Sequence, residues 1–115
     1  MNTIINIKQR SEICVGALAD NLERLLPEGR VVVITDANID RLYHPLVERF
    51  EHIIIGNGET NKTLQTVENI YRQLMAMGAD RSTFLLGIGG GIVTDITGFV
   101  AATYMRGVEF GFVST

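Results

Sequence analysis

The sequence predicts an α/β fold in which helices flank a parallel sheet. Short apolar or β-branched runs alternate with segments of helical periodicity along the whole chain of 115 residues. The β-branched run Val31–Ile34 is typical of a strand that is buried on both faces, as strands of parallel sheets are. Strands and helices that alternate at this spacing indicate right-handed βαβ units and therefore a parallel sheet.

The first half of the chain contributes three expected strands and two expected helices. Leu18, Leu22 and Leu25 share one face of the first helix. The segment Pro27–Gly29 ends that helix, and the turn Asp36–Asn38 leads into the next one. In order, we expect a strand at 3–8, a helix at 17–26, a strand at 30–35, a helix near 40–50 and a strand at 52–55.

The second half adds two helices and two strands. Leu64, Ile70 and Leu74 recur at helical spacing, and Gly78 is expected just beyond the end of their helix. In order, we expect a helix at 62–77, a strand at 83–88, a helix from about 92 to 104 and a strand at 109–113. These elements predict a single Rossmann-like α/β domain over residues 1–115.

Composition and charge narrow the functional class. The chain has 46% hydrophobic residues and a formal net charge of −3, and its 10 Lys and Arg residues are scattered, which argues against a nucleic-acid partner. No apolar stretch is long enough to span a bilayer, and the N-terminus lacks the form of a signal peptide. The single cysteine, Cys14, excludes an intrachain disulfide and is expected to be a core thiol. We therefore expect a soluble cytoplasmic domain.

The most informative feature is the glycine run Gly89–Gly91, between an expected strand and an expected helix. Glycines let the backbone approach a ligand closely, and the start of a helix favours a phosphate. The G-x-G-x-x-G fingerprint fails because Ile92 replaces the third glycine, and the P-loop fails because Asn61 precedes Lys62–Thr63. Asp95, expected in the first helical turn, would bind a ribose or substrate hydroxyl. Alternatively, the glycines permit tight strand–helix packing and Asp95 stabilises the helix dipole.

Three polar or glycine-rich segments follow strands of the predicted sheet. These are Asp36, Gly58–Glu59 and Gly89–Gly91, and the carboxyl ends of parallel strands meet at one edge where ligands bind. Simpler interpretations stay open for two of them. Asp36 could form an Asx turn that starts the next helix, and Glu59 with Lys62 could be a solvated charge pair.

The block GGGIVTDITGFVAATYMRG, from Gly89 to Gly107, closely resembles the signature of the 3-dehydroquinate synthase family. Thr35–Asn38 resembles the family's T-D-x-N, and Gly58–Lys62 resembles its G-E-x-x-K. The resemblance implies the N-terminal NAD-binding domain of a lyase of the shikimate pathway for aromatic amino acids. Such an enzyme converts 3-deoxy-D-arabino-heptulosonate 7-phosphate to 3-dehydroquinate and phosphate with recycled NAD.

The resemblance also assigns residues to the NAD site and to the phosphorylated substrate. Arg106 resembles the family arginine that binds the substrate phosphate, whereas its alternative role is to complement a helix C-terminus ahead of Gly107. The implied cofactor-binding residues are Asp36, Asn38, Asn57, Gly58, Glu59, Lys62, Gly90, Gly91, Ile92, Val93, Thr94, Asp95 and Thr115. No catalytic residue is assigned within the chain.

Other parts of the family pattern are absent from this chain. Ser114 stands where many members have proline, and the helical domain that holds the divalent metal, zinc or cobalt, is missing. His44 and His52 are expected to be surface or structural residues rather than ligands. We therefore expect a homodimeric parent enzyme of which this chain is a piece, truncated at its C-terminal end and inactive alone. The alternatives are an NAD-dependent polyol dehydrogenase of the glycerol type and a non-catalytic nucleotide-binding fragment.

Overall fold

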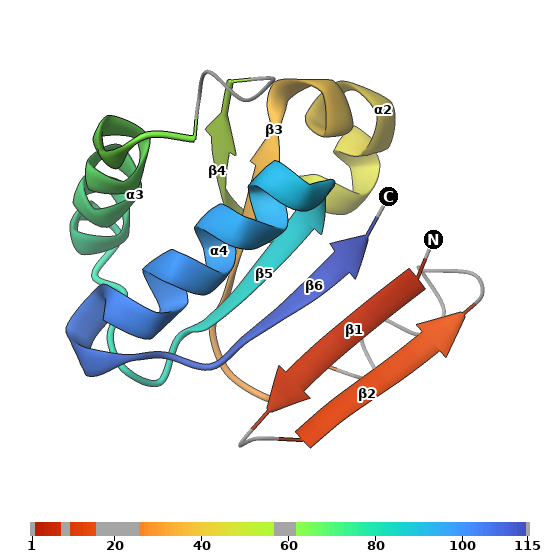
Figure 1. Cartoon of the computed structure of the whole chain (residues 1–115), viewed down its shortest axis with the longest axis horizontal. Coiled ribbons are helices and arrows are strands. Elements are labelled where there is room, and N and C mark those ends of the chain that lie inside the picture. The colour runs from red at the N-terminus through yellow and green to blue at the C-terminus, as the bar shows by residue number, and fades with distance from the viewer. Residues whose placement is uncertain (1, 8–9, 16–25, 57–61, 115) are drawn as a thin grey trace.

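The structure is a six-stranded sheet with helices on both faces (Figure 1). The computed structural model describes residues 2–7, 10–15, 26–56 and 62–114, with the side chains of 26–56 and 62–113. Its elements are β1 (Asn2–Ile7), β2 (Arg10–Val15), β3 (Val31–Asp36), α2 (Ala37–Val47), β4 (Glu51–Ile55), α3 (Leu64–Ala76), β5 (Phe84–Gly89), α4 (Gly91–Thr103), η2 (Tyr104–Arg106) and β6 (Phe110–Ser114).

Four neighbouring strands form the parallel sheet that the sequence predicts. The strand order is β2-β1-β6-β5-β3-β4, and β6, β5, β3 and β4 pair in parallel. Parallel strands bring their carboxyl ends to one edge, so Asp36, Ile55 and Gly89 end at that edge. The fold class predicted from the sequence is therefore confirmed. The helix expected at 17–26 lies almost entirely outside the described residues.

The N-terminus departs from the predicted all-parallel arrangement. β1 pairs antiparallel with both β2 and β6, so the chain begins with a hairpin at the side of the parallel strands. The sequence analysis expected one strand at 3–8 and missed β2 altogether. Lys8–Gln9 between the two strands contains none of the turn residues that mark a hairpin, which explains the miss. Cys14 lies in β2, and its predicted burial falls outside the described side chains.

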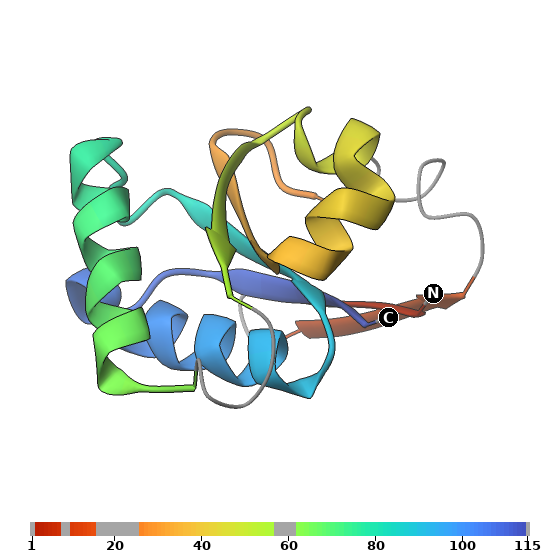
Figure 2. The same cartoon turned by 90° about the horizontal axis from the view of Figure 1, so that it is seen from above.

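Two apolar clusters fill the space between the sheet and its helices. Figure 2 shows α2 on one side of the sheet and α4 on the other. Residues alternate between these sides along each strand: Val32 and Ile34 belong to the α3 and α4 side, whereas Val33 belongs to the α2 side. The parallel strands are thus covered on both faces, which accounts for their nearly continuous apolar sequences.

Helix α2 begins three residues earlier than the sequence indicated, at Ala37 instead of Asp40. Asp36 is the N-cap: its Oδ1 accepts a hydrogen bond from the Ile39 N–H at 2.7 Å. The helix can therefore start directly after β3. At the end of α3, Gly78 has a φ of 73° and follows the C-cap Met77, as the sequence predicted. No helix in the described part of the chain is long and apolar enough to cross a membrane.

The end of α4 is tied to the loop that precedes β5. Tyr104 is 6% exposed, and its hydroxyl donates a hydrogen bond of 2.8 Å to the carbonyl oxygen of Ala79. Its ring stacks near that of Tyr71, with centroids 6.2 Å apart. Tyr71 has a hydroxyl contact of its own, with Thr103, that is exposed to solvent. The two tyrosines therefore offer a buried and an exposed hydrogen bond for comparison.

Tyr104→Phe should lower the free energy of unfolding by about 1 to 2 kcal/mol, because a buried carbonyl oxygen loses its donor. Tyr71→Phe removes an exposed hydrogen bond and should cost less than about 0.5 kcal/mol. Urea denaturation followed by circular dichroism measures both values. Equal losses for the two variants would contradict the assignment of the buried hydrogen bond.

His44 gives α2 a pH-dependent contribution to stability. Its Nδ1–H donates to Asp40 Oδ1 at 2.9 Å, and this hydrogen bond, with the charges of Asp40 and Glu48, raises the pKa of His44 above its ordinary value. A raised folded pKa stabilises the protein fully below the unfolded pKa, and this contribution is lost as pH rises through the folded pKa. The urea midpoint of the wild type should therefore exceed that of His44→Gln at pH 5.5, and the difference should shrink by pH 8.5. A difference that is constant with pH would refute this expectation.

Candidate functional site

A small pocket lies at the carboxyl edge of the parallel strands. It has a volume of about 120 Å³. Its lining residues come from the ends of β3 and β4 and from the start of α4: Asp36, Ile55, Gly56, Gly90, Gly91, Ile92 and Val93. Strand ends that are far apart in the sequence are thus brought to one place. We refer to this cavity as the edge pocket.

The glycines of the motif divide into two groups. A Cβ on Gly89 would lie 2.8 Å from Val93 Cγ2 and 2.9 Å from its Cβ, so this glycine is required for close packing of α4 on β5. A Cβ on Gly90 or on Gly91 would meet no described atom within 4 Å. The packing interpretation therefore holds for Gly89, whereas Gly90 and Gly91 border open space in the edge pocket.

The start of α4 presents backbone donors to the edge pocket. Gly90 is the N-cap and, having no side chain, provides no cap hydrogen bond. The Thr94 N–H bonds to the Gly90 carbonyl oxygen at 3.1 Å, so the N–H groups of Gly91, Ile92 and Val93 precede the first intrahelical bond. Such groups, together with the positive end of the helix dipole, favour a bound anion.

Asp36 and Asn38 occupy different surroundings. Asp36 lines the edge pocket while capping α2, so the capping role that the sequence left open is realised. A carboxylate has about four acceptor positions, and the Ile39 N–H uses one of them. Asn38 lies in the first turn of α2 outside the pocket, where its Oδ1 accepts a hydrogen bond of 2.6 Å from Arg41.

Lys62 and Asp95 form an ion pair beside the edge pocket. Lys62 Nζ lies 2.8 Å from Asp95 Oδ2, and the pair joins the segment before α3 to α4. It borders a second cavity of about 310 Å³, lined by Lys62, Thr63, Leu64, Val67, Asp95, Ile96 and Phe99. Both side chains are about half exposed, so the pair contributes little to stability. Because α4 begins at Gly91, Asp95 is its fifth residue, and the expected placement in the first turn is wrong.

Arg106 lies at the other end of α4 from the edge pocket. The helix has 13 residues, which corresponds to about 20 Å, and Figure 1 shows it running from the tip of β5 back to the start of β6. The helix ends at Thr103, and Met105 and Arg106 then adopt φ values of 47° and 69°. Arg106 is exposed in this turn, so this chain does not bring it to the edge pocket.

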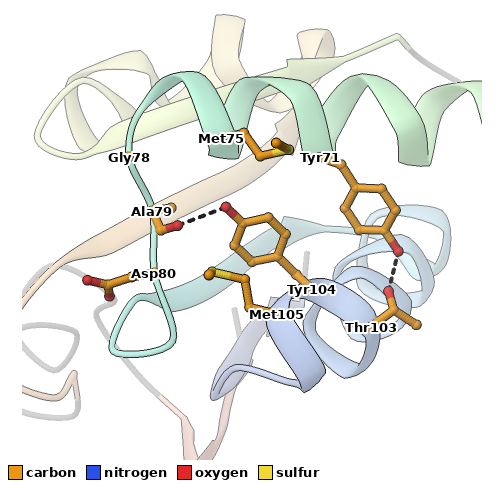
Figure 3. A pocket seen from close by; sticks show the side chains of 8 residues that line it. All are labelled: Tyr71, Met75, Gly78, Ala79, Asp80, Thr103, Tyr104 and Met105. Atoms are coloured by element: carbon orange, nitrogen blue, oxygen red, sulfur yellow. Dashed lines mark hydrogen bonds between the residues drawn. The ribbon is translucent and has the colours of Figure 1, made fainter.

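A larger cavity lies between the C-terminal ends of α3 and α4 (Figure 3). It has a volume of about 670 Å³ and is lined by Tyr71, Met75, Gly78, Ala79, Asp80, Thr103, Tyr104 and Met105. Hydrogen bonds from the Ser82 hydroxyl and N–H lower the pKa of Asp80 below its ordinary value. The cavity contains none of the residues that the sequence assigned to the cofactor, and it lies at the opposite end of the molecule from the edge pocket.

Several predicted site residues could not be placed. Asn57, Gly58, Glu59 and Thr115 lie outside the described residues. Thr94 is described, and its hydroxyl donates to the Gly91 carbonyl oxygen at 3.0 Å within α4. Among the residues that the structure describes, no group of histidine, cysteine and carboxylate side chains could hold a metal ion. His52, whose Nδ1 lies 2.9 Å from the Phe50 carbonyl oxygen, has a structural contact instead.

The sequence analysis missed some of the lining residues. Ile55 and Gly56 line the edge pocket, and the strand-end rule that selected Asp36 could have selected them as well. Leu64 and Phe99 line the neighbouring cavity and are 81% and 49% exposed. Leu64 was expected on the apolar face of its helix, so the periodicity gave no sign of its exposure, and Phe99 was assigned no role.

A known protein family matches more than half of the chain. Residues 52–115 match the family described as 3-dehydroquinate synthase N-terminal. Relatives named 3-dehydroquinate synthase include those of Ruminiclostridium cellulolyticum (38% identical, 96% of this chain and 34% of the relative) and Pyrococcus furiosus (40%, 88% and 32%). That of Dehalococcoides mccartyi is 45% identical over 84% of this chain and 29% of its own length. The chain spans about a third of the length of these curated relatives.

Solved structures share the fold. A crystal structure of 2-deoxy-scyllo-inosose synthase superposes with a TM-score of 0.77 over 96% of this chain and 35% of the neighbour, at 24% identity. A second, of 2-deoxy-scyllo-inosose synthase complexed with carbaglucose-6-phosphate, NAD+ and Co2+, has the same TM-score, 25% identity, and coverage of 100% and 35%. The arrangement of strands and helices is thus that of part of a larger enzyme.

The two groups of glycines should differ in their effect on stability. Gly89→Ala should lower the free energy of unfolding by about 1 to 3 kcal/mol, because the new Cβ overlaps Val93. Gly91→Ala should change it by less than about 0.5 kcal/mol, or raise it slightly, because the position is helical and open. Chemical denaturation of both variants provides the test, and a large loss for Gly91→Ala would show that this glycine is also needed for packing.

Proposed function

Because this chain belongs to the 3-dehydroquinate synthase family and matches the N-terminal part of its members, we propose that its edge pocket binds NAD. The observation that carries the proposal is that Asp36, Gly90 and Gly91 line one pocket at the start of α4. No side chain caps the helix there, so its first N–H groups are available to a ligand. A neighbour of the same fold has been crystallised with NAD+ and Co2+.

The residues of the edge pocket fit a dinucleotide. Gly90 and Gly91 leave room where any side chain would project, and the first N–H groups of α4 suit a pyrophosphate. Asp36 offers carboxylate oxygens to ribose hydroxyls at the end of β3. Lys62 and Asp95 continue the polar surface toward the second cavity, where a second ribose would bind. Asn38, Asn57, Gly58, Glu59, Ile92, Val93, Thr94 and Thr115 complete the proposed set.

For the whole protein we propose the 3-dehydroquinate synthase reaction. Its substrate is 3-deoxy-D-arabino-heptulosonate 7-phosphate, and its products are 3-dehydroquinate and phosphate. Bound NAD would supply a reversible hydride acceptor: oxidation of a substrate carbinol to a ketone would acidify the neighbouring C–H and permit elimination of phosphate, and return of the hydride would regenerate NAD. The part played by this chain is to bind and orient the cofactor. The divalent metal, zinc or cobalt, would be held by residues outside the described part of the chain, which offers no cluster of ligands.

The position of Arg106 bears on the proposed assembly. We propose Arg106 as a ligand of the substrate phosphate, for which its planar fork is suited. Since α4 separates Arg106 from the edge pocket of its own chain by about 20 Å, the arginine would serve the site of a second copy. This supports a homodimer, which we place in the cytoplasm on the strength of the composition and the resemblance.

The proposed reaction can be tested with the full-length protein that contains this chain. NAD, zinc and 3-deoxy-D-arabino-heptulosonate 7-phosphate are supplied, and phosphate release and NADH absorbance are followed together. We expect stoichiometric phosphate without accumulation of NADH, because the hydride returns within each turnover. Absence of phosphate release would refute the proposal. Accumulation of NADH with a polyol as substrate would instead identify a dehydrogenase, which no observation on this chain favours.

The variant Gly91→Ala tests NAD binding without a large effect on folding. A methyl group at this position would project into the edge pocket without disturbing the packing of α4. We expect the full-length variant to remain folded and to bind NAD at least about tenfold more weakly, since the backbone can no longer approach the pyrophosphate. Isothermal titration calorimetry with NAD gives the affinity, with His52→Gln, which is not among the residues that line the pocket, as a control that should bind normally. Unchanged affinity for Gly91→Ala would place the cofactor elsewhere.

A further inference from the structure

The face of β5 that packs against α4 carries few side chains, because glycine occupies two of its positions. Leu85 belongs to the cluster on the α4 side, and the alternation of strand residues puts Gly87 and Gly89 on the same side. Val93 rests on Gly89 and Thr97 rests on Gly87, one helical turn farther along. A Cβ on Gly87 would lie 2.6 Å from Thr97 Oγ1, 3.0 Å from its Cβ and 3.2 Å from its Cγ2.

Thr97 is unusual among the buried residues. Its side chain is fully buried, and its hydroxyl has no hydrogen-bond partner among the residues that the structure describes. Buried hydroxyl groups normally have a hydrogen-bond partner. Because this one has none among the described residues, hydrogen bonding does not account for a threonine at position 97. What the structure uses is its shape: Cβ and its two branches fill the space into which a side chain at position 87 would project. The contact therefore sets how closely α4 can approach β5.

We propose that Thr97, seated on Gly87, is a positioning residue for the cofactor. The inference rests on the proposed binding of NAD in the edge pocket. Thr97 lies six residues after Gly91 on the same helix, about 9 Å along its axis. Binding groups must be held within about 0.5 Å of their productive geometry. A displacement of α4 by a side chain at position 87 would therefore move the N–H groups of Gly91 and Ile92 away from the pyrophosphate.

The test measures NAD affinity of full-length variants by calorimetry, with circular dichroism to verify folding. Gly87→Ala should weaken NAD binding at least tenfold, because its Cβ displaces Thr97. Gly87→Ala/Thr97→Ala should restore the affinity to within about threefold of wild type, because alanine removes Oγ1 and Cγ2 and leaves one tight contact. Thr97→Val keeps the shape without the hydroxyl and should bind NAD as wild type does.

Val100→Ala is the matched control. Val100 is fully buried in α4, farther from the edge pocket, so its truncation should destabilise the protein while leaving NAD affinity unchanged. A merely structural role for Thr97 predicts that affinity follows stability in all variants, including Val100→Ala, and that result would overturn the inference. So would a folded Gly87→Ala that binds NAD normally.

Two further outcomes are decisive. If Gly87→Ala does not fold, the double variant Gly87→Ala/Thr97→Ala is measured in its place. A double variant that folds but does not bind NAD would overturn the inference. Absence of NAD binding by the wild type would instead contradict the proposed function itself. The failure of the positioning role and the failure of the cofactor assignment are thereby distinguished.

Discussion

The packing of α4 on the glycines of β5 is the constraint on which the rest of the structure depends. Gly87 and Gly89 remove the side chains that would separate helix from strand, and Val93 and Thr97 take their place. This contact lies between β3 and β6, at the centre of the parallel strands. It fixes where α4 begins, and the start of α4 forms one wall of the edge pocket.

The same helix separates the molecule into two ends with different chemistry. Its start carries backbone donors, open glycines and the Lys62–Asp95 pair. Its far end carries Tyr104, buried against the Ala79 carbonyl oxygen, and the exposed Arg106. Because the helix is rigid and anchored by Tyr104, the spacing between these ends is fixed by its length. In the proposed homodimer, this fixed spacing would place the arginine of one chain near the proposed cofactor site of the other.

Much of the fold could be predicted from local sequence patterns, and the predictions that were wrong have physical causes. The run Val31–Ile34 predicted a doubly buried strand because both faces of the parallel sheet are covered. The hairpin was missed because Lys8–Gln9 has no turn chemistry. At the candidate site, the strand-end rule found Asp36 and the glycines. It could not show that Gly89 packs while Gly91 faces open space, since that depends on tertiary distances.

The contact between Gly87 and Thr97 also limits how the sequence can change. The two positions lie on different elements, ten residues apart, yet they share one volume between helix and strand. A larger residue on the strand is compatible with the fold when the helix residue becomes smaller, and the reverse holds as well. During divergence the two positions are therefore expected to vary as a pair, so that relatives with alanine at the strand position carry a smaller residue than threonine on the helix.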